Sequence, residues 1–365
     1  MRNIFIFGYY GFQNTGDEAI LQVMIDQIKE NIPEANITVL SYKARETMEK
    51  YNIKAISRNK YVELIKAIKE SDIVVSGGGS ILQDATSARS LIYYLSIIYI
   101  AKKMGKKVMF YGNGFGPITK PLNKKLAQHI INTVDIITVR DQQSKDEMIS
   151  LGIKADILVT ADVTFAYGKL PEKQIEDILI QEEIDIDKKK VGISVRDWKD
   201  EEKYKSIIAE GGDYLINKGY EVVFIPMQHP RDYIVSEEIA AIMEGTPKIL
   251  EKIYCPKELV GLMEKLDIMI GMRLHSLIFS AIAGTPIVGI EYDSKIYNFL
   301  QLVHQESAGR VEDLDKETFI KTIDKVLYNR SKYKERIDYG REILHKKSEK
   351  NIVLLKSFME KGGIK

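Results

Sequence analysis

The sequence predicts an α/β protein made of two doubly wound, Rossmann-like domains. Short apolar runs of strand character alternate with longer amphipathic segments along most of the chain, which is the pattern of a parallel sheet covered on both faces. A charged stretch without strand character, residues 168–190, interrupts this alternation. The 365 residues are also too many for one small core. Two sheets joined near residue 180 account for all three observations.

The first domain is expected over residues 1–170. Its strands are predicted at residues 3–7, 37–41, 73–76, 107–111 and 136–139, with helices between them. The apolar run 91–101 is well short of the roughly twenty residues that span a bilayer, so we expect a buried helix there. The opening residues are expected to be the first strand, because they lack the apolar core and cleavage site of a signal peptide.

A linker is expected over residues 171–189 and a second domain over residues 190–345. The strands of the second domain are predicted at residues 191–195, 221–226, 268–271 and 286–290. The tail from Asp315 is expected to be helical and highly charged, packing on the second domain and back onto the first, with residues 346–365 as a C-terminal helix.

Composition excludes several classes of function. Lys and Arg total 53 against 52 Asp and Glu, and this net charge of +1 leaves no electrostatic footprint for nucleic acid. The single cysteine, Cys255, excludes an internal disulfide framework and fits a reducing compartment. The five histidines are too scattered for a zinc site, so no metal is expected. We therefore expect a cytoplasmic protein, and this leaves room for contact with the inner face of the membrane.

Ligands of open parallel sheets bind beyond the carboxyl ends of the strands, so the loops at those ends are the ones to inspect. In the first domain they are residues 8–20, 76–84 and 112–118, followed by a turn that starts at Arg140. Glycine there permits close approach of the backbone to an anion or a sugar. Neither G-x-G-x-x-G nor G-x-x-x-x-G-K-[ST] occurs, which argues against a dinucleotide or P-loop site.

The stretch 271–292 organises the candidate site. Leucines and isoleucines at helical spacing predict a short helix that Gly284 ends and a buried strand that follows, so that Arg273 and His275 lie at the start of the helix. The first turn of a helix favours an anion. Arg273 adds a permanently charged fork, and His275 adds a group that exchanges protons near neutral pH. Alternatively, Arg273 pairs with a nearby acid and His275 caps the helix.

Two further arginines, Arg140 and Arg196, each follow a predicted strand, and the three cations together would suit a substrate with two anionic ends. Each could instead form a surface salt bridge. Asp17 at the start of a helix either works on a substrate hydroxyl or is a favourable acid of the first turn. Trp198 could stack on a sugar or fill an apolar gap, and Gln83 and Asp84 could bind a sugar or cap a helix.

Six motifs occur together along residues 11–295: GFQNTGDEAIL, SGGGSILQD, YGNGFGPI, VRDQQS, GISVRDW and GMRLHSLIFSAIAGTPIVGIEYDSK. As a set, they resemble the polysaccharide pyruvyl transferases, most closely the bacterial CsaB type. The resemblance implies a GT-B-like pair of domains with the active site in the cleft between them. It carries Arg273, Leu274 and His275 over as donor-site residues, followed by Arg140.

The resemblance also implies an activity, which is transfer of pyruvate from phosphoenolpyruvate onto two hydroxyls of a sugar as a 4,6-ketal. The implied acceptor is N-acetylmannosamine of a secondary cell wall polymer, presented as a lipid-linked precursor, and the implied role is S-layer anchoring. The first domain is then the acceptor side and the second the phosphoenolpyruvate side, and no cofactor is required.

Roles for the candidate residues follow from this chemistry. We expect His275 to protonate the donor and Asp17 to accept a hydroxyl proton. The residues expected to bind substrate are Arg273, Leu274, Arg140, Arg196, Asn14, Gly16, Gly78, Gly79 and Asn113. Two other readings remain open: a GT-B glycosyltransferase that uses a nucleotide sugar, with Glu291 on the ribose, and a non-catalytic sugar-phosphate binding protein. The sequence leaves the oligomeric state open.

Overall fold

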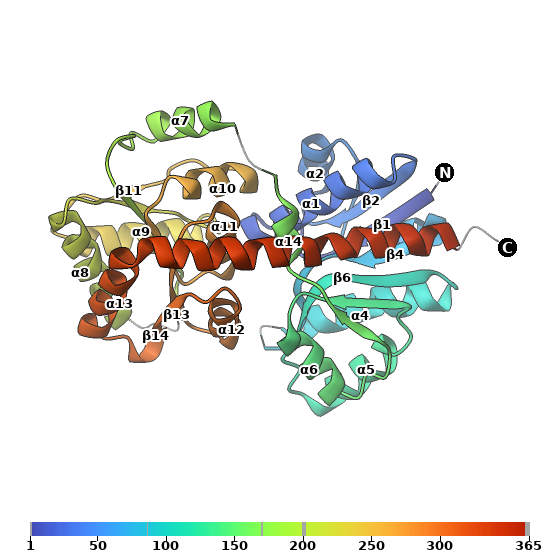
Figure 1. Cartoon of the computed structure of the whole chain (residues 1–365). Helices are drawn as coiled ribbons and strands as arrows, with labels where there is room; N and C mark the ends of the chain where they lie inside the picture. Colours follow the sequence, from blue (N-terminus) through green and yellow to red (C-terminus); the bar gives the residue numbers. More distant parts are fainter. Residues whose placement is uncertain (1, 86, 169–170, 199–201, 362–365) are drawn as a thin grey trace. The chain divides into compact units, whose positions relative to one another are not determined.

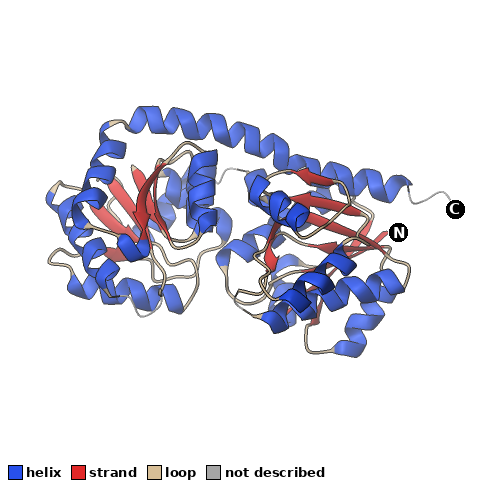
Figure 2. Ribbon diagram, turned by 90° about the horizontal axis from the view of Figure 1, so that it is seen from below, coloured by secondary structure: helices blue, strands red, loops and turns tan. Residues whose placement is uncertain are grey.

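The computed structural model describes residues 2–85, 87–168, 171–198 and 202–361. Two compact units divide the chain: the first is Met1–Ala166 with Leu344–Lys365, and the second is Tyr167–Ile343. Both are α/β, and in each a parallel sheet has helices on both faces (Figures 1 and 2). The expected fold class of two doubly wound units is therefore confirmed.

The sheet of the first unit has the strand order β3-β2-β1-β4-β6-β7-β8, and β5 pairs with β6 outside this path. All of these pairings are parallel. The strands are β1 (Arg2–Phe7), β2 (Ala35–Ser41), β3 (Lys54–Ser57), β4 (Ile73–Ser76), β5 (Gly79–Leu82), β6 (Lys107–Phe115), β7 (Ile136–Val139) and β8 (Ile157–Val159).

Buried apolar side chains of these strands and of the covering helices form the core of the first unit. The helices are α1 (Thr15–Asn31), α2 (Ala44–Tyr51), α3 (Tyr61–Glu70), α4 (Ala88–Lys103), α5 (Pro121–Ile131) and α6 (Gln142–Ser150), with a 3-10 turn at Val163–Ala166. The expected buried helix at residues 91–101 is α4, with Leu91, Leu95 and Ile98 wholly buried.

The sheet of the second unit has the order β11-β10-β9-β12-β13-β14. Its pairings are also parallel. The strands are β9 (Lys190–Ser194), β10 (Glu221–Phe224), β11 (Lys248–Ile249), β12 (Ile268–Gly271), β13 (Ile287–Glu291) and β14 (Glu306–Arg310). The helices are α7 (Glu172–Gln181), α8 (Lys203–Asn217), α9 (Arg231–Ile242), α10 (Pro256–Glu264), α11 (Leu274–Ala283), α12 (Ser294–Leu302) and α13 (Lys316–Tyr328), with a 3-10 turn at Val311–Asp313.

Three local expectations differ from the structure. The segment 171–189, expected to be a linker, contains helix α7 and belongs to the second unit. Residues 112–118 were expected to be a loop, but β6 continues to Phe115 because β5 and β7 pair with it there. The strands β3, β5, β8, β11 and β14 were not predicted, since they are short or polar.

Helix α14 (Arg330–Lys361) contributes residues to both units. From Leu344 onwards it belongs to the first unit, where Asn351 is wholly buried. The Oδ1 atom of Asn351 accepts hydrogen bonds from the hydroxyls of Thr138 at 2.6 Å and Thr160 at 3.2 Å. Ser348 Oγ donates to the backbone oxygen of Val163 at 3.1 Å. A buried polar cluster therefore joins this part of α14 to the ends of β7 and β8.

Asn351→Leu should lower the free energy of unfolding by about 1–3 kcal/mol, because it removes a buried amide that bonds to the hydroxyls of Thr138 and Thr160. Urea unfolding followed by circular dichroism measures the change. Val353, which is 59% exposed on the same helix, provides the control: Val353→Ala should change stability by less than about 0.5 kcal/mol. Equal effects of the two substitutions would contradict this role of Asn351.

Candidate functional site

Each sheet has a point where the strand order reverses direction, and ligands of doubly wound folds bind there, beyond the carboxyl ends of the strands. In the first unit this point lies between β1 and β4, and in the second it lies between β9 and β12. The segments that leave these strands are the glycine-rich loop after Phe7, the glycines after Ser76, the Arg196 loop and the start of α11. Most of the residues predicted from the sequence lie in these four segments.

The loop after β1 leads into α1, and Asn14 is the N-cap of that helix. Its side-chain oxygen accepts hydrogen bonds from the backbone amides of Gly16 at 3.1 Å and Asp17 at 3.3 Å. Asn14 therefore stabilises the helix start and leaves the partly exposed Asp17 in the first turn.

Asp17 lies directly over the glycines that follow β4. A β-carbon built on Gly79 would lie 2.7 Å from Asp17 Oδ1, and Gly79 has a φ of 88° that favours glycine. At Gly78 a β-carbon would lie 3.0 Å from Ile20 of α1. These two glycines thus let α1 approach β4 closely and bring the carboxylate of Asp17 to the switch point.

Two residues that sequence analysis did not single out hold the loop after β1 in place. Glu18 accepts hydrogen bonds from the amide of Gly11 at 2.7 Å and from the hydroxyl of Tyr51 at 3.1 Å. Tyr10 is wholly buried. Burial, together with the negative charges of Asp17 and Glu18, raises the pKa of Tyr10 well above its usual value. The phenol beside Asp17 therefore stays protonated.

Asn113 is wholly buried inside the first unit. Its side chain accepts from the amide of Tyr111 at 3.0 Å and donates to Gly77 O at 2.8 Å and to Ser76 Oγ at 3.2 Å. These bonds join the end of β6 to the glycine turn after β4. Asn113 is thus placed to shape that turn from beneath.

Arg140 is only 6% exposed and lies against two carboxylates. It donates to Asp141 at 3.2 Å, to Asp162 at 3.3 Å and to Ser80 Oγ at 3.2 Å. Burial acts to lower the pKa of Arg140, but the charges of Asp141 and Asp162 outweigh it and raise the pKa. The positive charge of Arg140 is therefore compensated within the protein.

Asp84 is buried near the start of α5. Its carboxylate accepts from the amides of Thr119 at 2.7 Å and Lys120 at 3.1 Å, and from the side chain of Asn123 at 2.8 Å. Burial acts to raise the pKa of Asp84, but the hydrogen bonds from Thr119, Asn123 and Lys120 lower it from 3.8 to about 2. Asp84 thus fixes the segment that enters α5.

In the second unit, Arg273 is the N-cap residue of α11. Its Nε donates to Asp232 Oδ2 at 2.9 Å, its Nη2 donates to Asp232 Oδ1, and the same Nη2 donates to Gln228 at 3.1 Å. Asp232 is wholly buried at the start of α9. Of the two readings of Arg273, the pairing with an acid is therefore present. Among the described residues Nη1 makes no hydrogen bond, and the side chain is 15% exposed.

Leu274 and His275 are the first two residues of α11. Arg273, Leu274 and His275 are all partly exposed, whereas the following residues from Ser276 are buried. The imidazole of His275 lies 6.1 Å from the ring of Phe279, one turn further along. These three residues are thus less buried than the rest of α11, although the Nε2 atom of His275 is itself buried.

Arg196 leaves the carboxyl end of β9, next to β12. Its guanidinium lies 4.4 Å from the ring of Tyr292 and 5.6 Å from that of Trp198. The indole of Trp198 donates to Glu312 at 3.2 Å, which fixes the aromatic pair. No acid of the described residues pairs with Arg196, so its charge is not compensated in that part of the chain.

His229 lies in the loop between β10 and α9, near the acid that holds Arg273. It is half-buried, and its ring centroid lies 5.9 Å from that of Tyr233. Burial lowers the pKa of His229, which favours the neutral imidazole near neutral pH.

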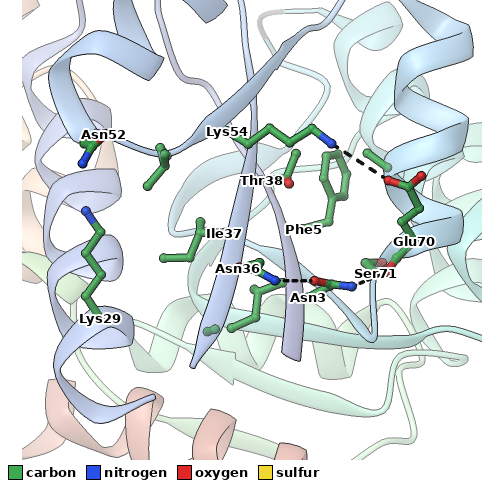
Figure 3. A pocket seen from close by; sticks show the side chains of 14 residues that line it. Asn3, Phe5, Lys29, Asn36, Ile37, Thr38, Asn52, Lys54, Glu70 and Ser71 are labelled. Atoms are coloured by element: carbon green, nitrogen blue, oxygen red, sulfur yellow. Dashed lines mark hydrogen bonds and ion pairs between the residues drawn. The ribbon is translucent and has the colours of Figure 1, made fainter. Parts of the chain in front are cut away.

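A cavity of about 440 Å³ lies at the opposite edge of the first sheet, beside the amino ends of β1, β2 and β3 (Figure 3). Many of its polar side chains bond to one another: Asn36 donates to Asn3 at 3.1 Å, and Lys54 lies 3.9 Å from Glu70. None of the residues predicted for the site lines this cavity. Within the described ranges, no helix combines the length and apolar composition needed to cross a membrane.

Comparisons with known proteins match the part of the chain that contains these segments. The family model described as polysaccharide pyruvyl transferase matches residues 14–294, which includes the cap of α1, the glycines after β4 and the start of α11. The chain is also similar to the amylovoran biosynthesis protein AmsJ of Erwinia amylovora. The two are 25% identical over 296 residues, which are 74% of this chain and 69% of AmsJ.

Solved structures with the same fold cover nearly the whole chain. The UDP-GlcNAc 2-epimerase of Neisseria meningitidis bound to UDP-GlcNAc is 14% identical with a TM-score of 0.66, over 99% of this chain and 100% of that one. MnaA of S. aureus with UDP is 12% identical with a TM-score of 0.68, over 99% and 97%. HepE of Anabaena with UDP-glucose is 13% identical with a TM-score of 0.65, over 99% of each chain. At these identities the likeness shows the fold.

The pKa of Asp84 predicts a pH-dependent contribution to stability. The pKa of Asp84 in the folded protein, about 2, lies below the ordinary 3.8. The ionised carboxylate therefore stabilises the protein fully above pH 3.8, and this contribution is lost as the pH falls from 3.8 through about 2. Asp84→Asn should therefore be less stable than the wild type at pH 7, and the gap should narrow toward pH 3. A gap that stays constant between these pH values in urea unfolding would contradict the assignment.

Asp232→Asn should destabilise the second unit by about 3–5 kcal/mol, because it leaves the guanidinium of Arg273 without its buried counter-charge. Thermal unfolding and urea unfolding both measure the loss. Glu172, 74% exposed and 2.7 Å from Lys265, is the matched control, and Glu172→Gln should change stability far less because solvent screens an exposed ion pair. Similar losses for both variants would contradict a buried, structurally important pair.

Proposed function

The chain belongs to the polysaccharide pyruvyl transferase family, and we propose that it transfers pyruvate from phosphoenolpyruvate onto two hydroxyls of a sugar, forming a cyclic ketal. The observation that carries this proposal is the family match over residues 14–294. The matched residues include Asp17 after β1, Arg196 after β9, and Arg273 with His275 at the start of α11, which lie at the switch points of the two sheets. We further propose the CsaB-type reaction, with N-acetylmannosamine as the acceptor in a secondary cell wall polymer used for S-layer anchoring.

The second unit binds the donor in this proposal. Phosphoenolpyruvate carries a carboxylate and a phosphate, which call for two cationic contacts. Arg273 offers Nη1, which makes no hydrogen bond among the described residues, while Asp232 holds Nε and Nη2 in place. Arg196 follows β9, the strand next to β12, and offers a guanidinium oriented by Tyr292 at 4.4 Å. Both clamps therefore come from adjacent strands of one sheet.

This arrangement changes the role that we give to Arg140. Because Asp141 and Asp162 compensate its charge and only 6% of it is exposed, Arg140 is a poor anion clamp. It is better suited to position Ser80 and the β5 segment. Asn113, which is buried beneath the glycine turn, has a similar positioning role.

His275 protonates the methylene carbon of phosphoenolpyruvate, and the resulting cationic carbon is attacked by the first sugar hydroxyl. That hydroxyl gives up its proton to Asp17 as the C–O bond forms. The C–O bond to phosphate then breaks, phosphate leaves, and the second hydroxyl closes the ring on the same carbon. One hydroxyl proton replaces the proton that His275 delivered, and the other leaves with phosphate. This chemistry requires no metal or organic cofactor.

The test compares phosphoenolpyruvate with UDP-sugars as donors, and the wild type with His275→Ala. The wild type, given phosphoenolpyruvate and N-acetylmannosamine glycosides, should release phosphate and increase the mass of the acceptor by one pyruvyl ketal, whereas UDP-sugars should release no UDP. His275→Ala should lower turnover by about 100-fold or more and change phosphoenolpyruvate affinity little. His129→Ala, an exposed histidine of α5, is the control with wild-type turnover.

UDP release without phosphate release would replace the proposal with a nucleotide-sugar glycosyltransferase. Binding of phosphoenolpyruvate without any turnover would favour a binding protein. Turnover of His275→Ala within a few-fold of the wild type would move the general acid to another residue.

A further inference from the structure

A stack of three aromatic rings lies at the carboxyl edge of the first sheet. Tyr9 and Phe12 come from the loop after β1, and Tyr42 directly follows β2. The rings of Tyr9 and Phe12 are 4.1 Å apart and within 6° of parallel. The rings of Phe12 and Tyr42 are 4.8 Å apart and within 14° of parallel. We call these three residues the aromatic platform.

A cation accompanies the aromatic platform. Arg58 directly follows β3, and its guanidinium lies 5.3 Å from the ring of Phe12 and 4.6 Å from the ring of Tyr93. The hydroxyl of Tyr93 donates to the backbone oxygen of Arg58 at 3.2 Å. No acid of the described residues pairs with Arg58, whereas Arg140 and Arg273 both have acidic partners. Within the described part of the chain, Arg58 is therefore a positive charge without an acidic partner, at the carboxyl edge where ligands of such sheets bind.

The aromatic platform is held rigidly. The amide of Tyr42 donates to Tyr10 O at 2.9 Å, and the amide of Arg58 donates to Ser41 O at 3.1 Å. Gly11 has a φ of 79°, and a β-carbon on it would lie 2.3 Å from Ser41 Oγ. The loop is thus pressed against the end of β2, and a ligand that stacks on these rings meets a surface that is already ordered.

Tyr42, at one end of the stack, is exposed to solvent. Tyr42 is 51% exposed, although two of the rings in the stack are partly covered. The exposed ring of Tyr42 stacks on Phe12, and Arg58 contacts Phe12 in turn. An exposed aromatic ring near a guanidinium that has no acid partner among the described residues fits a ligand ring with an apolar face and an attached anion. A pyranose carrying a phosphate ester has this combination, because its C–H face stacks on an aromatic ring and its phosphate pairs with a guanidinium.

We propose that the aromatic platform with Arg58 is the acceptor subsite, where a pyranose stacks on Tyr42 and its phosphate ester contacts Arg58. The proposal rests on the proposed function, since the acceptor of pyruvyl transfer is a sugar. Phe12, on which Tyr42 stacks, lies in the loop that leads to Asn14, the N-cap of α1, and Asp17 lies in the first turn of that helix. The segment that supports the aromatic platform therefore also carries the residue proposed to deprotonate the acceptor. The phosphate could belong to a free sugar phosphate or to a lipid diphosphate.

Calorimetry on the full chain tests the subsite without any donor. N-acetylmannosamine 1-phosphate should bind the wild type, and Tyr42→Ala should weaken binding by about tenfold. Tyr42→Phe, which keeps the ring face, should stay within about twofold of the wild type, as should Tyr328→Ala, which removes a tyrosine that is 91% exposed at the end of α13. Arg58→Gln should weaken the sugar phosphate and leave unphosphorylated N-acetylmannosamine unchanged. Inorganic phosphate binding as tightly as the sugar phosphate would overturn the stacking.

If Tyr42→Ala does not fold, a second measurement on the wild type tests the same proposal. In saturation-transfer NMR on the wild type, irradiation of the aromatic protons should saturate the ring protons of the bound sugar, and no transfer would overturn the proposal. Repeating the calorimetry with the sugar as a short-chain lipid diphosphate identifies the source of the phosphate, and Tyr42-dependent binding of either form supports the subsite.

Steady-state kinetics separates this proposal from the proposed function. Tyr42→Ala should raise KM for the acceptor by about tenfold and leave KM for phosphoenolpyruvate within about twofold. Pyruvyl transfer with an unchanged acceptor KM would overturn the subsite and leave the function standing. Tyr42-dependent sugar-phosphate binding without pyruvyl transfer would leave the subsite standing and overturn the function.

Discussion

Parallel pairing of β1 with β4 and of β9 with β12 determines where this protein can do chemistry. In both sheets the chain first adds strands on one side and then crosses to the other. The segments leaving the two central strands therefore diverge at the carboxyl edge, which is where ligands of doubly wound folds bind. Asp17 and the glycines after β4 meet at one such point, and Arg196 and the start of α11 lie at the other. Residues far apart in the sequence are thus placed at one edge of each sheet by strand order alone.

Charge compensation then distinguishes between cations that look equivalent in the sequence. Arg140, Arg196 and Arg273 all follow a strand. Arg140 lies between two carboxylates, Arg273 shares two of its nitrogens with one carboxylate, and Arg196 stacks on aromatic rings. A guanidinium fixed by a buried acid is well oriented but has less net attraction for an anion. Binding of a doubly negative donor would therefore depend strongly on Arg196 and on the first turn of α11.

The sequence was sufficient for the fold because its signals are local. The nine predicted strands carry buried apolar runs, and α11 begins and ends where Arg273 and Gly284 predict. Strands such as β14 (Glu306–Arg310) and β5 (Gly79–Leu82) were missed because pairing partners, rather than apolar character, make them strands. Roles within the site were harder to predict. Asp232 is 41 residues from Arg273, and nothing in the local sequence marks it as the partner.

The same limit explains why the aromatic platform was not predicted from sequence. Tyr9, Phe12, Tyr42 and Arg58 come from three different strand ends, and each alone resembles an ordinary loop residue. Only the order β3-β2-β1 brings them side by side. This order also places all four residues on one side of the switch point, while the glycines and Asn113 lie toward β4 and β6. A sugar stacked on Tyr42 would therefore approach Asp17 from the β2 side, across a surface already ordered by Glu18 and Tyr10.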